Sequence, residues 1–76
     1  MTKKDMIGYG KKIKEEKPNL FGLYLHTLLK INFSEVDYFN DLPWVRPDNT
    51  RVAFYGKYKN GNSFCVVSHN VDNKWD

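Results

Sequence analysis

The spacing of apolar residues predicts a first helix from about residue 3 to residue 17. Four small or apolar side chains fall on one side of it: Met6, Tyr9, Gly10 and Ile13. Pro18 ends this helix, since the residue before a proline avoids helical geometry. Gly8 and Gly10 each cost about 1 kcal/mol inside a helix. Either they permit close packing, or the helix begins after them.

A second helix is expected from Leu20 to about Ile31, with Asn19 as its N-cap. Apolar residues cover most of its circumference, and only a narrow strip with His26 and Lys30 is polar. A helix that is apolar nearly all round is buried on several sides. We therefore expect it to be the central element of the fold.

The segment SEVDYFNDLPW, residues 34–44, predicts a short third helix from about Glu35 to Asn40. Ser34 is a good N-cap, and Val36 and Phe39 are three residues apart, so both can face the core. Pro43 stops this helix. An extended loop with a turn at residues 47–49 is expected to follow.

The last third of the chain predicts a β-hairpin, with strands at residues 51–58 and 63–69 around Asn60-Gly61. A two-residue turn would place Tyr58 opposite Ser63. One face of the hairpin would then carry Val52, Phe54, Gly56, Tyr58, Cys65, Val67 and His69. The other would carry Ala53, Tyr55, Lys57, Lys59, Phe64, Val66 and Ser68, and we expect this face to be half-exposed. A bulge at Asn62 would swap the faces of one strand.

These elements predict a single small α+β domain over residues 1–76. Two to three N-terminal helices pack on a C-terminal antiparallel β-hairpin or small sheet. An isolated hairpin is barely stable in water, so it needs the helices or a third strand.

The net charge is +3, and it is distributed unevenly. Residues 1–17 carry six lysines and three acids, whereas residues 34–50 carry four acids and one arginine. The single cysteine suits a reducing compartment, and the N-terminal residues lack the apolar run of a signal peptide. The longest apolar stretch is too short to cross a bilayer. We therefore expect a cytoplasmic protein without membrane association.

The residues argue against an enzyme. Cys65 and His69 are four apart on one strand, about 13 Å, which is too far for a nucleophile and its base. His26 stands alone, Cys65 is expected to be buried, and no glycine-lysine pattern typical of a phosphate loop is present. We predict no catalytic residues, no metal site and no cofactor.

Exposed aromatic rings beside charges favour a protein-binding surface, because such rings are enriched at interface hot spots. The candidates are Tyr38, Asp41, Trp44, Tyr55, Lys57, Lys59 and Phe64. Trp44 is open between core and interface. The main hypothesis is a non-catalytic regulator or inhibitor that binds a host or cellular protein. The chain has one alanine and no glutamine, a bias of AT-rich genomes that favours a phage or mobile element as its source. The oligomeric state stays open.

The alternative is a small nucleic-acid-binding protein. Its candidates are Lys4, Lys11 and Lys14 on the first helix with Lys57 and Lys59 on the hairpin. The order of three helices and a hairpin resembles a winged helix. The third helix of that arrangement, however, would present Glu35, Asp37 and Asp41 to the phosphates.

Overall fold

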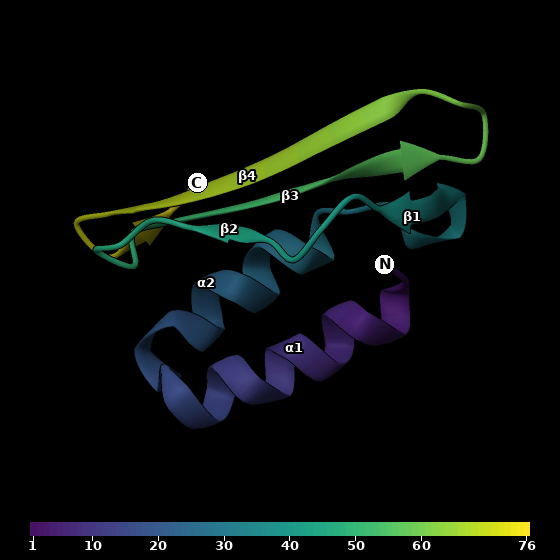
Figure 1. The fold of residues 1–76 in the computed structure, drawn as a ribbon. Coiled ribbons are helices and arrows are strands. Elements are labelled where there is room, and N and C mark those ends of the chain that lie inside the picture. Colours follow the sequence, from purple (N-terminus) through teal and green to yellow (C-terminus); the bar gives the residue numbers. More distant parts are fainter.

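Two helices cover one face of a five-stranded antiparallel sheet in the computed structural model, which describes residues 1–76 (Figure 1). The helices are α1 (Lys3–Glu16) and α2 (Pro18–Leu29), followed by a 3₁₀ turn, η1 (Phe33–Glu35). The strands are β1 (Val36–Phe39), β2 (Trp44–Val45), β3 (Arg51–Tyr58), β4 (Ser63–Val71) and β5 (Lys74–Trp75). The predicted α+β layout is confirmed, with α2 between most of α1 and the sheet.

Helix α1 includes both glycines in question. Thr2 caps it through a capping box in which the Thr2 hydroxyl accepts from the Asp5 amide and the Asp5 carboxylate accepts from the Thr2 amide. The backbone hydrogen bond from Thr2 is the main cause that lowers the pKa of the Asp5 carboxyl. A Cβ on Gly10 would lie 3.0 Å from Cε1 of Tyr24, whereas nothing lies within 4 Å of a Cβ on Gly8. Gly10 therefore permits the close approach of α2.

Helix α2 begins two residues earlier than predicted, with Pro18 in its first turn. Asn19 is not its cap, since Lys17 occupies that position without a side-chain hydrogen bond. Proline suits the first helical position because its missing N–H would have no partner there. The helix is central as expected, although Leu25 and Leu29 on its far side are exposed.

The predicted third helix is wrong. Residues 36–39 form strand β1, and only the 3₁₀ turn precedes it. Val36 pairs with Tyr58 and Tyr38 with Lys57, so Asp37 is one extra residue, a β-bulge. The bulge shifts the side-chain alternation by one. Val36 and Phe39 consequently both face the helices, at the spacing that also suits a helical turn.

Strands β1 and β2 both pair with the same edge of β3 and run in the same direction. Between them, the Asn40 amide donates to the Tyr55 carbonyl oxygen at 2.9 Å. Strands β1 and β2 thus form one edge strand, which is interrupted by residues 41–43. Pro43 in this interruption is buried. The predicted hairpin is part of a small sheet in which β3 is the centre.

The hairpin of β3 and β4 has a register one residue away from the two-residue turn. Lys57 lies opposite Ser63, and Gly56 lies opposite Phe64. The loop has three residues, with Gly61 at φ +90° and its amide bonded to the Tyr58 carbonyl oxygen. This left-handed position after a turn is typical of three-residue hairpin loops. Residues 64–69 of β4 therefore face the sides opposite to those predicted.

The C-terminal residues fold back on α2. Asp72 and Asn73, at φ +52° and +64°, form the tight turn between β4 and β5. The indole of Trp75 then lies over Gly22, where a Cβ would be 2.5 Å from Cη2. Its ring centroid is 5.7 Å from that of His26. Trp75 therefore covers one side of α2.

The core lies between the helices and the inner face of the sheet. The largest fully buried side chains include Tyr24, Phe39, Phe54 and Met6. The rings of Phe39 and Phe54 meet nearly edge to face at 6.0 Å, as aromatic pairs prefer. Phe64 adds a second edge-to-face contact to Phe39, at 5.7 Å. The aromatic rings of three strands therefore form one cluster beneath α2.

The two glycines of α1 provide a matched test of this packing. Gly8→Ala should raise the free energy of unfolding by roughly 0.5–1 kcal/mol, because alanine favours the helix and meets nothing. Gly10→Ala should lower it by about 1 kcal/mol or more, because the added methyl presses on Tyr24. Urea denaturation of both variants measures the difference. Equal stabilisation by both substitutions would contradict the close helix contact.

Candidate functional site

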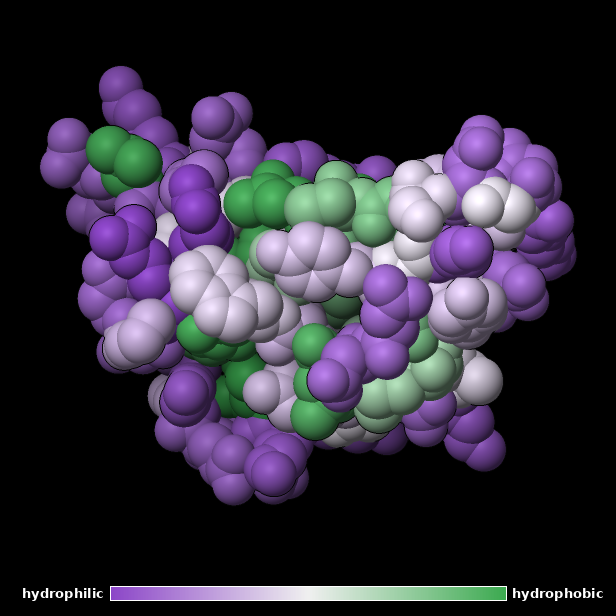
Figure 2. Space-filling view, turned by 45° about the horizontal axis from the view of Figure 1, so that its top comes forward, coloured by the Kyte–Doolittle hydropathy of each residue, from purple (hydrophilic) through white to green (hydrophobic).

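The face of the sheet turned away from the helices is bare and aromatic. We call it the outer face. Pairing partners in antiparallel strands share a face, which places these residues on it: Tyr38, Trp44, Arg51, Ala53, Tyr55, Lys57, Ser63, Cys65, Val67 and His69. Tyr38, Trp44 and Tyr55 are 40%, 45% and 44% exposed. Figure 2 brings the top of Figure 1 forward and shows apolar and weakly polar side chains gathered in the middle, with hydrophilic ones at the rim.

The bulge at Asp37 orients Tyr38. Without the extra residue, Val36 and Tyr38 would share a face; with it, Tyr38 is opposite Lys57 on the outer face. The next residue, Phe39, is 1% exposed and fixes the strand from below. An exposed aromatic ring and an exposed cation are therefore paired across β1 and β3 on the outer face.

A structured turn holds Trp44. The Arg46 amide donates to the Arg51 carbonyl oxygen, and Asp48 accepts from both the amide and the hydroxyl of Thr50. The hydroxyl bond, at 2.6 Å, is the main cause that lowers the pKa of the Asp48 carboxyl. Trp44 pairs with Ala53. Trp44 is thus half-exposed on the outer face and does not belong to the core.

Ala53 shows how the outer face is covered in its middle. Although it faces away from the helices, it is only 1% exposed. Its neighbours across the strands are Trp44 on one side and Val67 on the other. These larger side chains shield the methyl group and form a continuous surface above it.

The single cysteine lies on the outer face, contrary to the expectation that it is buried. Cys65 is opposite Tyr55 and its thiol is free and exposed. The one-residue change of register explains both Cys65 and Val67, which sequence reasoning placed toward the helices. Only the alternative register, with a bulge at Asn62, places both residues on the outer face.

Phe64 is the clearest correction among the predicted binding residues. It pairs with Gly56 on the inner face and is 8% exposed. A Cβ on Gly56 would meet the Phe64 ring at 2.7 Å, so the ring packs directly on the glycine backbone. Phe64 belongs to the core and cannot form a surface with Tyr55.

The remaining candidates lie at the border of the outer face or away from it. Asp41 is exposed in the loop between β1 and β2, where its carboxylate accepts from the Leu42 amide. Lys59 is exposed in the β3–β4 loop, beyond the end of the strand. Lys4, Lys11 and Lys14 are exposed on α1, which lies on the helix side of the molecule (Figure 1). The structure therefore separates these three lysines from Lys57.

At the other end of the outer face, Arg51 and His69 lie opposite each other. Nε of Arg51 donates to Nε2 of His69, so this imidazole nitrogen is an acceptor. No group of three or more histidine, cysteine or acidic side chains is arranged to hold a metal ion. What the outer face offers is therefore contact area, rings and a few charges.

Comparison with protein-family models, with curated proteins and with solved structures found no match to this chain. Neither helix is long and apolar enough to cross a membrane.

The sequence places Tyr55 and Phe64 on one surface, whereas the structure places them on opposite faces of the sheet. Truncation of the two rings should therefore lower the free energy of unfolding by different amounts. Phe64→Ala should lower the free energy of unfolding by about 3–5 kcal/mol, since it removes a buried ring. Tyr55→Ala should lower it by at most about 1 kcal/mol, because nearly half of that side chain is exposed. Thermal and urea denaturation measure both. A large loss with Tyr55→Ala and a small one with Phe64→Ala would reverse the assigned faces.

Proposed function

We propose that the protein is a non-catalytic binding module that recognises another protein through the outer face of its sheet. The observation that carries this proposal is the placement of Tyr38, Trp44 and Tyr55 from three strands on one uncovered face. Contiguous exposed apolar surface marks interaction sites in small proteins. Tyrosine and tryptophan are also the residues that contribute most at protein interfaces.

The shape of the surface favours a macromolecule over a small ligand. Small-molecule sites are concave and enclose most of the ligand. The one pocket of this molecule lies between the helices, away from the outer face. A sheet face with half-exposed rings instead offers area, which suits the broad contact of a protein partner.

Two opposite charges, one within the outer face and one at its border, support a specific orientation of the partner. Lys57 lies within the outer face, and Asp41 lies in the loop between β1 and β2. Charges at the rim of an interface guide association and exclude wrong partners more than they add affinity. We therefore expect Asp41 to face a basic group of the partner.

A small domain of this kind acts by covering part of its partner, so we propose a role as a regulator or inhibitor. The exposed thiol of Cys65 suits the reducing conditions of a cytoplasm. The alanine-poor composition supports a phage or mobile element of a low-GC bacterium as the source. The partner would then be a protein of the host cell.

The proposal is tested by capture from a nuclease-treated lysate of a low-GC bacterium, followed by affinity measurements with the captured protein. Tyr38→Ala and Asp41→Lys should each weaken the complex about tenfold or more while the thermal midpoint stays nearly unchanged. Lys12→Ala and Glu16→Lys are the controls on the helices, outside the outer face, and should keep full affinity. Equal affinity of Tyr38→Ala, Asp41→Lys and the controls would exclude the outer face as the binding surface.

The free thiol gives an independent measurement. Because Cys65 lies opposite Tyr55, a bound partner should slow its alkylation by a maleimide, as followed by mass spectrometry. Unchanged alkylation in the complex would contradict the proposal. So would a dimer of the chain alone that Tyr55→Ala dissociates, since the outer face would then join two copies.

A second candidate is single-stranded nucleic acid, favoured by the rings of Tyr38 and Tyr55 beside Lys57 on an open sheet. Bases stack on such rings, and a nearby cation contacts the backbone. The lysines of α1 lie on the other side of the molecule, so they add no charge to this face. We rank this function second because Lys57 and Arg51, at opposite ends of the outer face, give a weak electrostatic contribution.

Fluorescence anisotropy with a labelled oligothymidine distinguishes the two functions. We expect weak binding with a shallow dependence on salt, because few phosphates are neutralised. Tight binding that falls steeply with salt and is lost in Lys57→Gln would favour nucleic acid as the ligand. A Lys14→Gln variant on the helix side provides the charge-matched control.

A further inference from the structure

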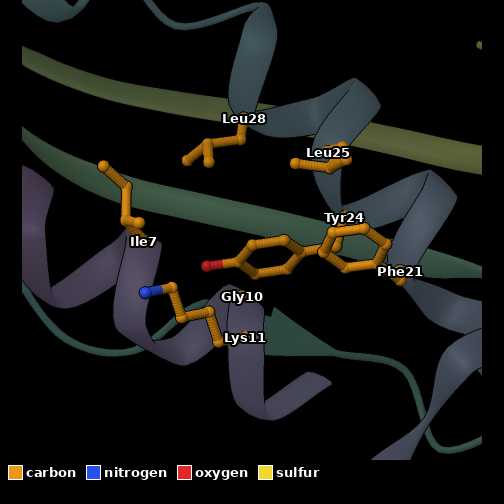
Figure 3. A pocket seen from close by; sticks show the side chains of 7 residues that line it. All are labelled: Ile7, Gly10, Lys11, Phe21, Tyr24, Leu25 and Leu28. Carbon is orange, nitrogen blue, oxygen red and sulfur yellow. The ribbon is translucent and has the colours of Figure 1, made fainter. Parts of the chain in front are cut away.

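A second surface lies on the helix side of the molecule, and neither function above involves it. Helices α1 and α2 enclose a pocket of about 150 Å³, shown in Figure 3. Its lining is Ile7, Gly10, Lys11, Phe21, Tyr24, Leu25 and Leu28. The close-up shows the apolar side chains of α2 and the Ile7 and Lys11 side chains of α1 around the ring of Tyr24. We call it the helix groove.

The groove exists because glycine is at position 10. The ring of Tyr24 lies against this glycine, and its hydroxyl donates to the Met6 carbonyl oxygen at 2.6 Å. Burial is the main cause that raises the pKa of the Tyr24 phenol, so the hydroxyl stays a donor. The polar atom of Tyr24 is thereby satisfied inside the protein. The floor of the groove presents only apolar surface.

The two walls of the groove differ in charge. Helix α2 contains no lysine, arginine, aspartate or glutamate, and its wall consists of Phe21, Leu25 and Leu28. On α1, Ile7, Lys11 and Lys14 are spaced i, i+4 and i+7, so they form one stripe along the helix. Nζ of Lys14 lies 5.5 Å from the ring centroid of Phe21, which ties this cation to the groove. One wall is apolar, and the other combines the apolar Ile7 with two lysines.

Exposed apolar side chains continue the groove at its rim. Ile7 is 50% exposed, Leu25 is 38% exposed, and Leu29 follows one turn later on α2. A cavity of about 150 Å³ accommodates a benzene-sized group. The size therefore matches one leucine or phenylalanine side chain of a binding partner.

We propose that the helix groove binds an acidic amphipathic helix of a protein partner. One apolar side chain of that helix fills the pocket above Tyr24, and its carboxylates lie against Lys11 and Lys14. This is the helix-in-groove mode, in which anchors at i, i+3 or i+4 supply the contact. The opposite charges of the two sides define the register. The concave floor favours a peptide over a lipid surface, because one inserted side chain fills a pocket, whereas membrane binding buries a broad apolar helix face.

The probe is a fluorescent helical peptide of about 15 residues, built from glutamate, alanine and leucine with leucines at i, i+4 and i+7. It should bind the full chain, and added salt should weaken the complex. Lys11→Glu should lower the affinity roughly five- to tenfold, and Ile7→Glu should lower it more. Lys12→Glu is the matched control. Lys12 is exposed on α1, but its spacing of five residues from Ile7 places it off the stripe of Ile7, Lys11 and Lys14. It should change the affinity less than about twofold.

Several outcomes would overturn the proposal. The first is no binding of the peptide at millimolar concentration. The second is equal affinity of the Lys11→Glu and Lys12→Glu variants for the peptide. The third is equal affinity of the protein for a peptide in which lysine replaces glutamate. Binding to anionic lipid vesicles in place of the peptide would assign the groove to membranes instead. Self-association that Ile7→Glu abolishes would assign it to a second copy. Circular dichroism of each variant ensures that a loss of binding is not a loss of folding.

Discussion

The position of Tyr24 is the constraint on which the rest of the fold depends. Its ring lies 5.3 Å from that of Phe54 in the sheet and 6.0 Å from that of Tyr9 in α1. Its hydroxyl is bonded to the backbone of α1. One side chain of α2 therefore contacts the sheet, fills the helix interface and satisfies a carbonyl oxygen of α1. A chain of 76 residues has a thin core, so such shared contacts carry much of its stability.

Because α2 and its aromatic contacts supply the core on one side of the sheet, the other side is left without a covering layer. Both α-helices of residues 1–76 lie on the inner side of the sheet. The bulge at Asp37 and the three-residue loop ending at Gly61 then determine which rings point which way. Phe39 and Phe64 are directed inward, whereas Tyr38 and Tyr55 are directed outward. Two local irregularities thus distinguish the core from the candidate binding surface.

The sequence predicted the elements that depend on long periodic patterns. Helix α1, the central position of α2 and the existence of the β3–β4 hairpin follow from such patterns. The prediction was wrong where a single extra residue changes the alternation of side chains along a strand. Val36 and Phe39 are three apart in either a helical turn or a bulged strand, so spacing alone does not separate them. Asn60-Gly61 fits a two-residue or a three-residue loop, and that single residue moved Phe64 from the surface to the core.

The surface was accordingly predicted in part. Tyr38, Trp44, Tyr55 and Lys57 lie on one face, as a shared binding surface requires, but Cys65 and Val67 replace Phe64 in it. Ile7 and Leu25 of the helix groove were missed, because a periodic apolar pattern gives the same signal for a covered and an uncovered side. Pairing between distant strands and the depth of a groove are tertiary properties. They require the structure.

The interrupted edge strand has a consequence for the free protein in the cell. A bare aromatic sheet beside a long, flat edge invites other chains to add strands and aggregate. Here the outer edge is built from two short strands, with a charged bulge at Asp37 and the buried Pro43 between them, and Met1 already pairs with the outward N–H and C=O of Phe39. Bulges, short edges and proline all hinder the alignment of an incoming strand. The same residues that orient Tyr38 and Trp44 toward the outer face thus also hinder the polymerisation of the chain.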